Sequence, residues 1–134
     1  MATKMFVNLP VKDLNRSVGF FEKLGYSFNP QFTDENATCM IIGEDIYAML
    51  LVESFFKTFT PKPIADAKTT TEVLVALSMD SRDEVTHIVE TALAAGAGRY
   101  KDPDDQGFMY TWGFEDPDGH IWEYFWMDPA TIEG

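Results

Sequence analysis

The sequence predicts an α+β fold of two tandem βαβββ modules, which together form a curled mixed-sheet cup with flanking helices. One order of features occurs twice along the 134 residues: a strand, an acidic helix cap, a helix, a glycine and three strands. Asp13 and Gly25 bound the first helix, and Asp80 and Gly96 bound the second, at offsets of 67 and 71 residues. Apolar residues make up 46% of the chain, enough to bury a core, so we predict a single domain over 1–134.

The first module, about 4–53, is predicted to contain one helix and four strands. Asp13 can accept a hydrogen bond from a free N–H of the first helical turn, and Gly25 permits the left-handed conformation that ends a helix. The helix therefore spans 14–24. Runs of β-favouring apolar residues on both sides of it predict strands. These strands cover 5–11, 26–32, 37–43 and 46–52.

The connector, 54–70, combines phenylalanines with prolines and threonines, so we expect it to cross the surface with its aromatic side chains packed against the body. The second module, about 71–128, then repeats the first. Ser81 and Glu84 have the spacing of a capping box, in which each satisfies a free N–H at the start of the helix. Predicted strands cover 72–79, 98–101, 107–114 and 120–127, and Asp116–Gly119 forms a tight turn before the last.

The charge of the chain excludes several classes of partner. Its net charge of −12 and pI near 4.3 repel nucleic acids and anionic membrane surfaces.

The one cysteine, Cys39, cannot form an internal disulfide and lies in an apolar run, so we expect a buried thiol. No apolar stretch approaches the roughly 20 residues that span a bilayer. The N-terminus does not have the pattern of a signal peptide, so we expect a cytoplasmic protein.

Two stretches resemble the vicinal oxygen chelate superfamily, which includes glyoxalase I, fosfomycin and bleomycin resistance proteins, and extradiol dioxygenases. The stretch from Leu9 to Gly25 is similar to its first strand and helix. Asp116–Pro117–Asp118–Gly119–His120, followed by Ile121–Trp122–Glu123, is similar to its closing hairpin. The resemblance implies paired βαβββ modules, a homodimer, and a cup in which a divalent metal binds adjacent oxygens of the substrate. An unpaired strand edge also favours a dimer.

The same resemblance assigns metal ligands to four positions, one in the first and one in the last strand of each module. Here those positions hold Phe6, Ala48 or Met49, Leu74 (give or take one residue) and Glu123. Phenylalanine and leucine have no lone pair to donate, and a thioether is a poor ligand for hard or borderline cations. Since Zn²⁺ or Ni²⁺ needs three or four donors, we expect no cofactor. Glu123 is the metal ligand only if a divalent metal is present.

Glu123 is the leading candidate for a functional residue, since a carboxylate in an apolar strand must be paired or hydrogen-bonded. It is interpreted as a general base or polar anchor in the cup; the alternative is a structural glutamate satisfied by the backbone or by a neighbouring Tyr or Trp. Asn8 and Glu72 share strand parity with the vacant ligand positions, so a shifted site of Asn8, Glu72 and Glu123 is one hypothesis. The other is that Glu72 is a solvated residue at the start of a strand.

Aromatic residues alternate along one face of the strand at 107–114, from Phe108 to Phe114. This face is either ordinary core or a wall of the cup, where Tyr110 and Trp112 would offer a hydroxyl and an indole N–H to a ligand. His120 adjoins the turn and His87 lies on the polar face of its helix, so both are expected to be exposed. A histidine-based metal site or a Ser–His–Asp triad is therefore not expected.

Two functions are compatible with these residues. In the first, the cup binds a small apolar or cationic molecule without turnover, as the resemblance to bleomycin resistance proteins implies, and the acidic surface attracts a cation. In the second, the chain is a lyase, isomerase or dioxygenase that uses Glu123 as a base or metal ligand, with glyoxalase I disfavoured. The fold alone does not choose between them.

Overall fold

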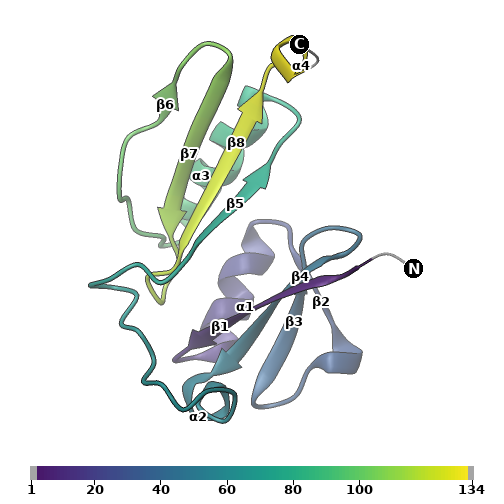
Figure 1. The fold of residues 1–134 in the computed structure, drawn as a ribbon, viewed down its shortest axis with the longest axis vertical. Helices are drawn as coiled ribbons and strands as arrows, with labels where there is room; N and C mark the ends of the chain where they lie inside the picture. The colour runs from purple at the N-terminus through teal and green to yellow at the C-terminus, as the bar shows by residue number, and fades with distance from the viewer. Residues whose placement is uncertain (1–2, 133–134) are drawn as a thin grey trace. The chain divides into compact units, whose positions relative to one another are not determined.

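The computed structural model describes residues 3–132 and divides the chain into two compact units, Met1–Ala65 and Asp66–Gly134. Each unit contains a four-stranded mixed sheet with one long helix on one of its faces (Figure 1). The predicted α+β class and the two βαβββ modules are confirmed. The single domain and the module limits stay predictions. None of the described helices is long and apolar enough to cross a membrane.

The first unit contains a sheet with the strand order β1-β4-β3-β2, in which only the β1–β4 pair is parallel. Alternate residues of β1, β4 and β3, such as Leu9, Leu50 and Met40, are buried with Phe20 and Phe21 of the helix. The opposite face of the sheet carries Phe6 and Asn8, both exposed. The elements are β1 Met5–Val11, α1 Leu14–Lys23, β2 Ser27–Asn29, the 3₁₀ turn Pro30–Phe32, β3 Ala37–Ile41, β4 Ile46–Val52 and α2 Glu53–Phe56.

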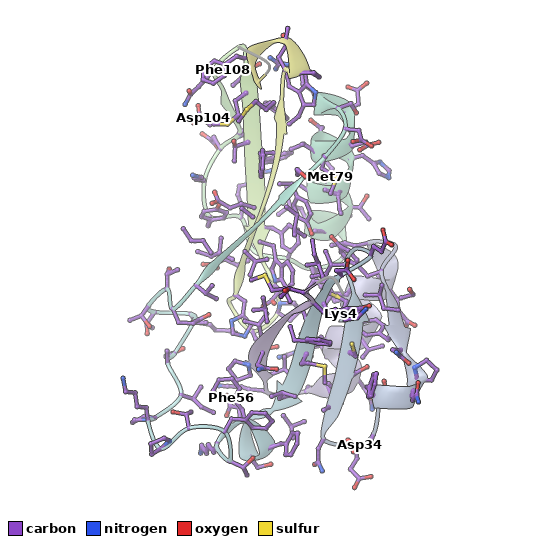
Figure 2. All side chains as sticks on the ribbon, turned by 45° about the vertical axis from the view of Figure 1, so that its right-hand side comes forward. Lys4, Asp34, Phe56, Met79, Asp104 and Phe108 are labelled. Carbon is purple, nitrogen blue, oxygen red and sulfur yellow. The ribbon has the colours of Figure 1, made fainter. Side chains whose placement is uncertain are left out.

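The second unit repeats this arrangement with the strand order β5-β8-β7-β6 and a parallel β5–β8 pair. Val85, Val89 and Ala92 form the buried stripe of its helix, α3, with the spacing of one face of an α-helix. Asp104 and Phe108 lie near the same end of this unit (Figure 2). The elements are β5 Leu74–Ser78, α3 Arg82–Ala94, β6 Asp104–Asp105, β7 Met109–Glu115, β8 Ile121–Met127 and α4 Pro129–Ile132.

The helix ends follow the predicted capping chemistry, with one change of partner. Asp13 Oδ1 accepts a hydrogen bond from the Arg16 N–H at 3.1 Å, and Ser81 Oγ accepts one from the Glu84 N–H at 3.1 Å. The Glu84 carboxylate reaches back to the N–H of Asp80, at 3.0 Å, instead of that of Ser81. The second cap is therefore Ser81, not Asp80, so Phe6 and Leu74 each lie seven residues before a cap.

Several strand predictions were partly or wholly wrong. Residues 98–101 form no strand; Gly98 makes one isolated bridge to Glu115, and the partner of β7 is instead β6. The strand expected at 26–32 ends at Asn29, because Pro30 begins a 3₁₀ turn whose first free N–H is capped by the Asn29 side chain at 2.9 Å. The strand expected from residue 72 begins at 74. Cys39 is buried as a free thiol, as expected.

Candidate site around Glu123

The two faces of the second sheet differ in what covers them. Strand pairing places Tyr110, Trp112 and Phe114 of β7 on one face of the sheet. Their cross-strand partners on the same face are Trp126, Tyr124 and Trp122 of β8. The Tyr110 hydroxyl lies 3.0 Å from Thr86 Oγ1 of α3, so this is the face that the helix covers. Glu123 has the opposite parity. Tyr110 and Trp112 are therefore separated from Glu123 by the sheet.

The polar atoms of Tyr110 and Trp112 are already used within the unit. The Trp112 indole N–H donates to the Lys101 carbonyl oxygen at 3.2 Å, and the Arg99 guanidinium lies 5.7 Å from the centre of the Trp112 ring. The Arg82 guanidinium similarly lies 5.6 Å from the centre of the Tyr110 ring. These contacts fit the interpretation of the two aromatic residues as core. A ligand-binding role for them stays a prediction, and it would lie on the other face of the sheet from Glu123.

Glu123 lies in the middle of β8, between Gly113 of β7 and Ala76 of β5. Its side chain is 16% exposed, and its Oε2 atom accepts a hydrogen bond from the Tyr100 hydroxyl at 2.8 Å. The ammonium of Lys101 lies 3.4 Å from the same oxygen. Within the described residues, no hydrogen bond reaches Oε1. The carboxylate is thus fixed through one oxygen, while the other keeps its lone pairs.

Gly113 makes the approach of Tyr100 to Glu123 sterically feasible. A Cβ atom at position 113 would lie 3.1 Å from the Tyr100 hydroxyl oxygen and would overlap the carbonyl oxygen of Trp122. Burial raises the pKa of Tyr100 well above its ordinary value, and the hydrogen bond to the Glu123 carboxylate raises it further. The phenol therefore stays protonated at neutral pH and donates to Glu123.

Tyr100 and Lys101 were not among the residues that the sequence nominated. They belong to the segment that was predicted as a strand at 98–101, and the isolated Gly98–Glu115 bridge places this segment beside β7. Trp112 anchors the segment through its indole N–H, and the Lys101 ammonium lies 5.6 Å from the centre of the Tyr100 ring. No periodicity marks these two residues, because their contacts to Glu123 are made across a long stretch of sequence.

Glu72 is partnered by His120 rather than by solvent alone. Glu72 Oε1 lies 2.9 Å from Nδ1 of His120, and the His120 backbone N–H donates to Asp116 Oδ1 at 3.0 Å. His120 is only 2% exposed, so the prediction of an exposed turn histidine was wrong. The Glu72 carboxylate provides a polar partner for the buried imidazole, and Asp116 accepts from the backbone of the same residue. His87, in contrast, is exposed on α3 as predicted.

Asn8 lies on β1 in the first unit, exposed and paired in register with Met49 of β4. Glu72 and Glu123 both belong to the second unit, where Glu72 precedes β5. Glu72 contacts His120, whereas Glu123 contacts Tyr100 and Lys101, so the contacts of the two carboxylates are separate. The shifted site of Asn8, Glu72 and Glu123 stays a prediction.

The strand register identifies the residues at the four positions where the resemblance implies metal ligands. Ala76 pairs with Glu123 as Asn8 pairs with Met49, so Met49 rather than Ala48 is the counterpart of Glu123. Phe6 is 46% exposed and stacks on Tyr47 with ring centres 4.8 Å apart; Leu74 is 55% exposed.

One carboxylate, one thioether and two hydrocarbon side chains do not form a donor set for a divalent metal. Across residues 3–132, no three His, Cys, Asp or Glu side chains gather so that they could hold a metal ion. The residues present therefore do not fit the family's metal.

Comparison with known proteins agrees with this architecture. A family model described as bleomycin resistance protein-like N-terminal matches residues 3–43. A hypothetical protein from S. aureus is 27% identical, with a TM-score of 0.78, over 93% of this chain and 94% of its own. A glyoxalase/bleomycin resistance protein/dioxygenase from Nocardioides is 26% identical, with a TM-score of 0.72, over 97% of this chain and 86% of its own. In sequence and in fold, the chain resembles the vicinal oxygen chelate superfamily.

More distant members of the vicinal oxygen chelate superfamily share the fold. The bleomycin resistance determinant encoded on transposon Tn5 is 18% identical, with a TM-score of 0.65, over 96% of this chain and 99% of its own. No curated protein matches the sequence. These comparisons support the resemblance that the two sequence stretches predicted.

Proposed function

We propose that this chain is a glyoxalase/bleomycin-resistance-like protein that binds a small apolar or cationic molecule without a metal ion. The ligand would donate a hydrogen bond from an N–H, O–H or ammonium group to Oε1 of Glu123. The observation that supports this is the geometry of the carboxylate, in which Tyr100 and Lys101 both contact Oε2 and no hydrogen bond from a described residue reaches Oε1. A hydrogen bond to such a partly buried carboxylate is worth more than one to an exposed carboxylate.

The surroundings of Glu123 favour an apolar ligand body. Leu74 and Ala76 lie on β5 with the same parity as Glu123, and Leu74 is largely exposed. The net charge of −12 raises the local concentration of cations over anions.

Binding is tested by isothermal titration with bleomycin and with small aromatic amines, on wild type and on Glu123→Gln. The Gln variant removes the charge and keeps the shape, so binding should weaken by about tenfold or more, the loss expected for one hydrogen bond to a charged group. Glu90→Gln, an exposed change on α3, is the matched control and should have no effect. The proposal fails if no cation binds, or if Glu123→Gln binds as tightly as wild type.

The absence of a metal requirement is a separate part of the proposal, and the donor set supports it. Only Glu123 among the four equivalent positions carries a carboxylate, and one carboxylate does not hold Zn²⁺ or Ni²⁺ at useful affinity. Protein purified without added metal should contain well under one equivalent of Zn, Ni, Mn or Fe by mass spectrometry. A stoichiometric ion, lost in Glu123→Gln, would contradict this part and leave ligand binding to be judged by the titration.

A lyase or isomerase that uses Glu123 as general base is the second candidate. It draws support from the same oxygen, because a base needs a free lone pair and a fixed orientation, which Tyr100 provides. We expect such an enzyme to exchange an acidic C–H of a bound α-hydroxy ketone with D₂O, seen by loss of the proton NMR signal. Exchange that persists in Glu123→Gln, or that occurs with no member of a ketone panel, would refute this candidate. The donor set offers no support for a dioxygenase.

We also expect the chain to form a homodimer. The strand orders place β1 at one edge of the first sheet and β5 at one edge of the second, and a sheet edge presents unpaired N–H and C=O groups. Light scattering should give twice the 15.2 kDa of one chain. A monomer at concentrations well above those used for ligand titration would contradict this expectation.

A further inference from the structure

We infer that the site around Glu123 selects zwitterionic ligands. The ligand's ammonium would donate a hydrogen bond to Glu123, and its anionic group would bind to Lys101. This inference rests on the proposed function, since it assigns a second contact to a ligand held by Glu123. It makes Lys101 a residue that determines specificity.

The position of Lys101 is built by its neighbours. Its carbonyl oxygen accepts the Trp112 indole N–H at 3.2 Å, which fixes the backbone. Its ammonium lies 3.4 Å from Glu123 Oε2 and 5.6 Å from the centre of the Tyr100 ring, so carboxylate and aromatic ring both attract it. The side chain is nevertheless 50% exposed. A positive charge is thereby held at the edge of the site and remains accessible to a ligand.

The contact between Lys101 and Glu123 leaves donors available. Charge-assisted hydrogen bonds are typically shorter than the 3.4 Å of this pair, and Tyr100 makes the short contact to Oε2, at 2.8 Å. An ammonium has three N–H donors, so Lys101 can bind a carboxylate or phosphate while it stays beside Glu123.

The same charge works against a simple cation. A ligand ammonium at Oε1 would lie close to Lys101 and be repelled by it, so a ligand that carries only a positive charge loses part of the attraction of Glu123. A ligand that carries only a negative charge would face the carboxylate. A zwitterion places an opposite charge against each partner, and so the pair favours it over both.

Three ligands that share a phenyl group and differ in charge test this preference: L-phenylalanine, 2-phenylethylamine and 3-phenylpropionate. Their dissociation constants are measured at low salt from the shifts of the amide resonances of residues 100–101 and 123. Phenylalanine should bind tighter than 2-phenylethylamine by about two- to fivefold, the range that a half-exposed ion pair allows. Lys101→Met should remove or reverse this preference, whereas Lys62→Met, an exposed lysine in the connector, should not.

The outcomes separate the inference from the proposed function. If 2-phenylethylamine binds at least as tightly as phenylalanine and Glu123→Gln abolishes its binding, the zwitterion inference is overturned and the proposed function stands. If the preference for phenylalanine persists in Lys101→Met, Lys101 does not determine specificity. If none of the three ligands shifts the resonances of the site in wild type, both the inference and the proposed site are refuted.

Discussion

The buried carboxylate of Asp116 should be the most sensitive polar group of the closing hairpin. Its Oδ1 accepts the N–H groups of Asp118 and His120 at 2.9 and 3.0 Å, and its Oδ2 accepts the Trp122 indole N–H at 3.0 Å. The His120 and Trp122 donors are buried, and a buried donor without a partner costs about 1–3 kcal/mol. Asp116→Ala should therefore lower the free energy of unfolding by about 2–5 kcal/mol, less whatever is gained by removing a buried charge.

An asparagine at the same position distinguishes the contributions of the two carboxylate oxygens of Asp116. Asp116→Asn keeps an acceptor for the backbone N–H of His120 but turns an NH₂ group toward the indole N–H of Trp122, so it should cost about 1–3 kcal/mol. In a Trp122→Phe background the opposing donor is absent. The same change to Asn should then cost close to nothing, because the two positions are coupled.

The double-mutant cycle is measured by urea unfolding followed by circular dichroism, so that the loss of a tryptophan does not change the signal. Asp102→Asn, an exposed change, is the control and should have no effect. The reasoning is refuted if the costs of Asp116→Asn and Trp122→Phe are simply additive. It is also refuted if Asn at position 116 is no better tolerated than Ala.

The pH dependence of the same variants has a defined sign. Burial raises the pKa of Asp116 above its ordinary value, so the folded state holds this proton more tightly than the unfolded state does. The resulting stabilisation is fully present below the unfolded pKa, about 4, and is lost as pH rises through the folded pKa. The stability of wild type relative to Asp116→Asn should fall across this window. A difference that rises with pH would contradict the assignment.

Three further predictions concern Gly113, Tyr100 and the segment 104–107. Gly113→Ala should destabilise by about 1–3 kcal/mol in urea unfolding and displace Tyr100 from Glu123, because its Cβ would overlap a backbone carbonyl; a variant as stable as wild type would refute this. The pKa of Tyr100 is raised in the folded state, so its hydroxyl contributes stability that is fully present below about pH 10 and is lost as pH rises through the folded pKa. Unfolding measured between pH 9 and 12 should show that the difference in unfolding free energy between wild type and Tyr100→Phe shrinks as pH rises. Arg82→Lys should speed amide hydrogen exchange at residues 104–107 several-fold, because lysine cannot reproduce the two-pronged contact with Asp105 and the carbonyl at 107; unchanged exchange would count against this.

The parts of the fold that could be predicted are those set by local chemistry. Asp13 caps α1 through an N–H three residues away, and Gly25 and Gly96 end the helices with φ of 100° and 105°. Each of these features is decided within one turn of the chain, so a single sequence contains the necessary information. Alternation along β7 likewise grouped Tyr110, Trp112 and Phe114 correctly on one face.

Alternation could not show which face of the sheet the helix covers. Apolar residues occur at both parities of β7 and β8, so periodicity gave two equivalent choices for Tyr110 and Trp112. Only the contact from Tyr110 to Thr86 on α3 decides between them. The contact joins residues 24 positions apart, and no local pattern records it.

The environment of each candidate carboxylate was beyond sequence analysis for the same reason. The hydrogen bond from Tyr100 to Glu123 spans 23 positions, and the contact between His120 and Glu72 spans 48. Sequence analysis gave only the general requirement that a carboxylate in an apolar strand needs a partner, and Tyr100 is that partner. The identity of that partner depends on the path of segment 98–101, which forms no strand. The Trp112 indole N–H donates to the Lys101 carbonyl and so helps to fix this path.

The two modules share one backbone plan but differ at corresponding positions of their last strands. Met49 and Glu123 occupy the same register against the edge strand, yet only Glu123 has an opposing glycine, Gly113, and a tyrosine that reaches over it; its counterpart Met49 pairs with Cys39. A thioether needs no such support, whereas a half-buried carboxylate does. The supporting residues, Gly113 and Tyr100, therefore occur only in the module that carries the carboxylate, although both modules share the fold. This asymmetry is why we place the chemistry of the protein in the second module, with one carboxylate oxygen as its reactive or binding atom.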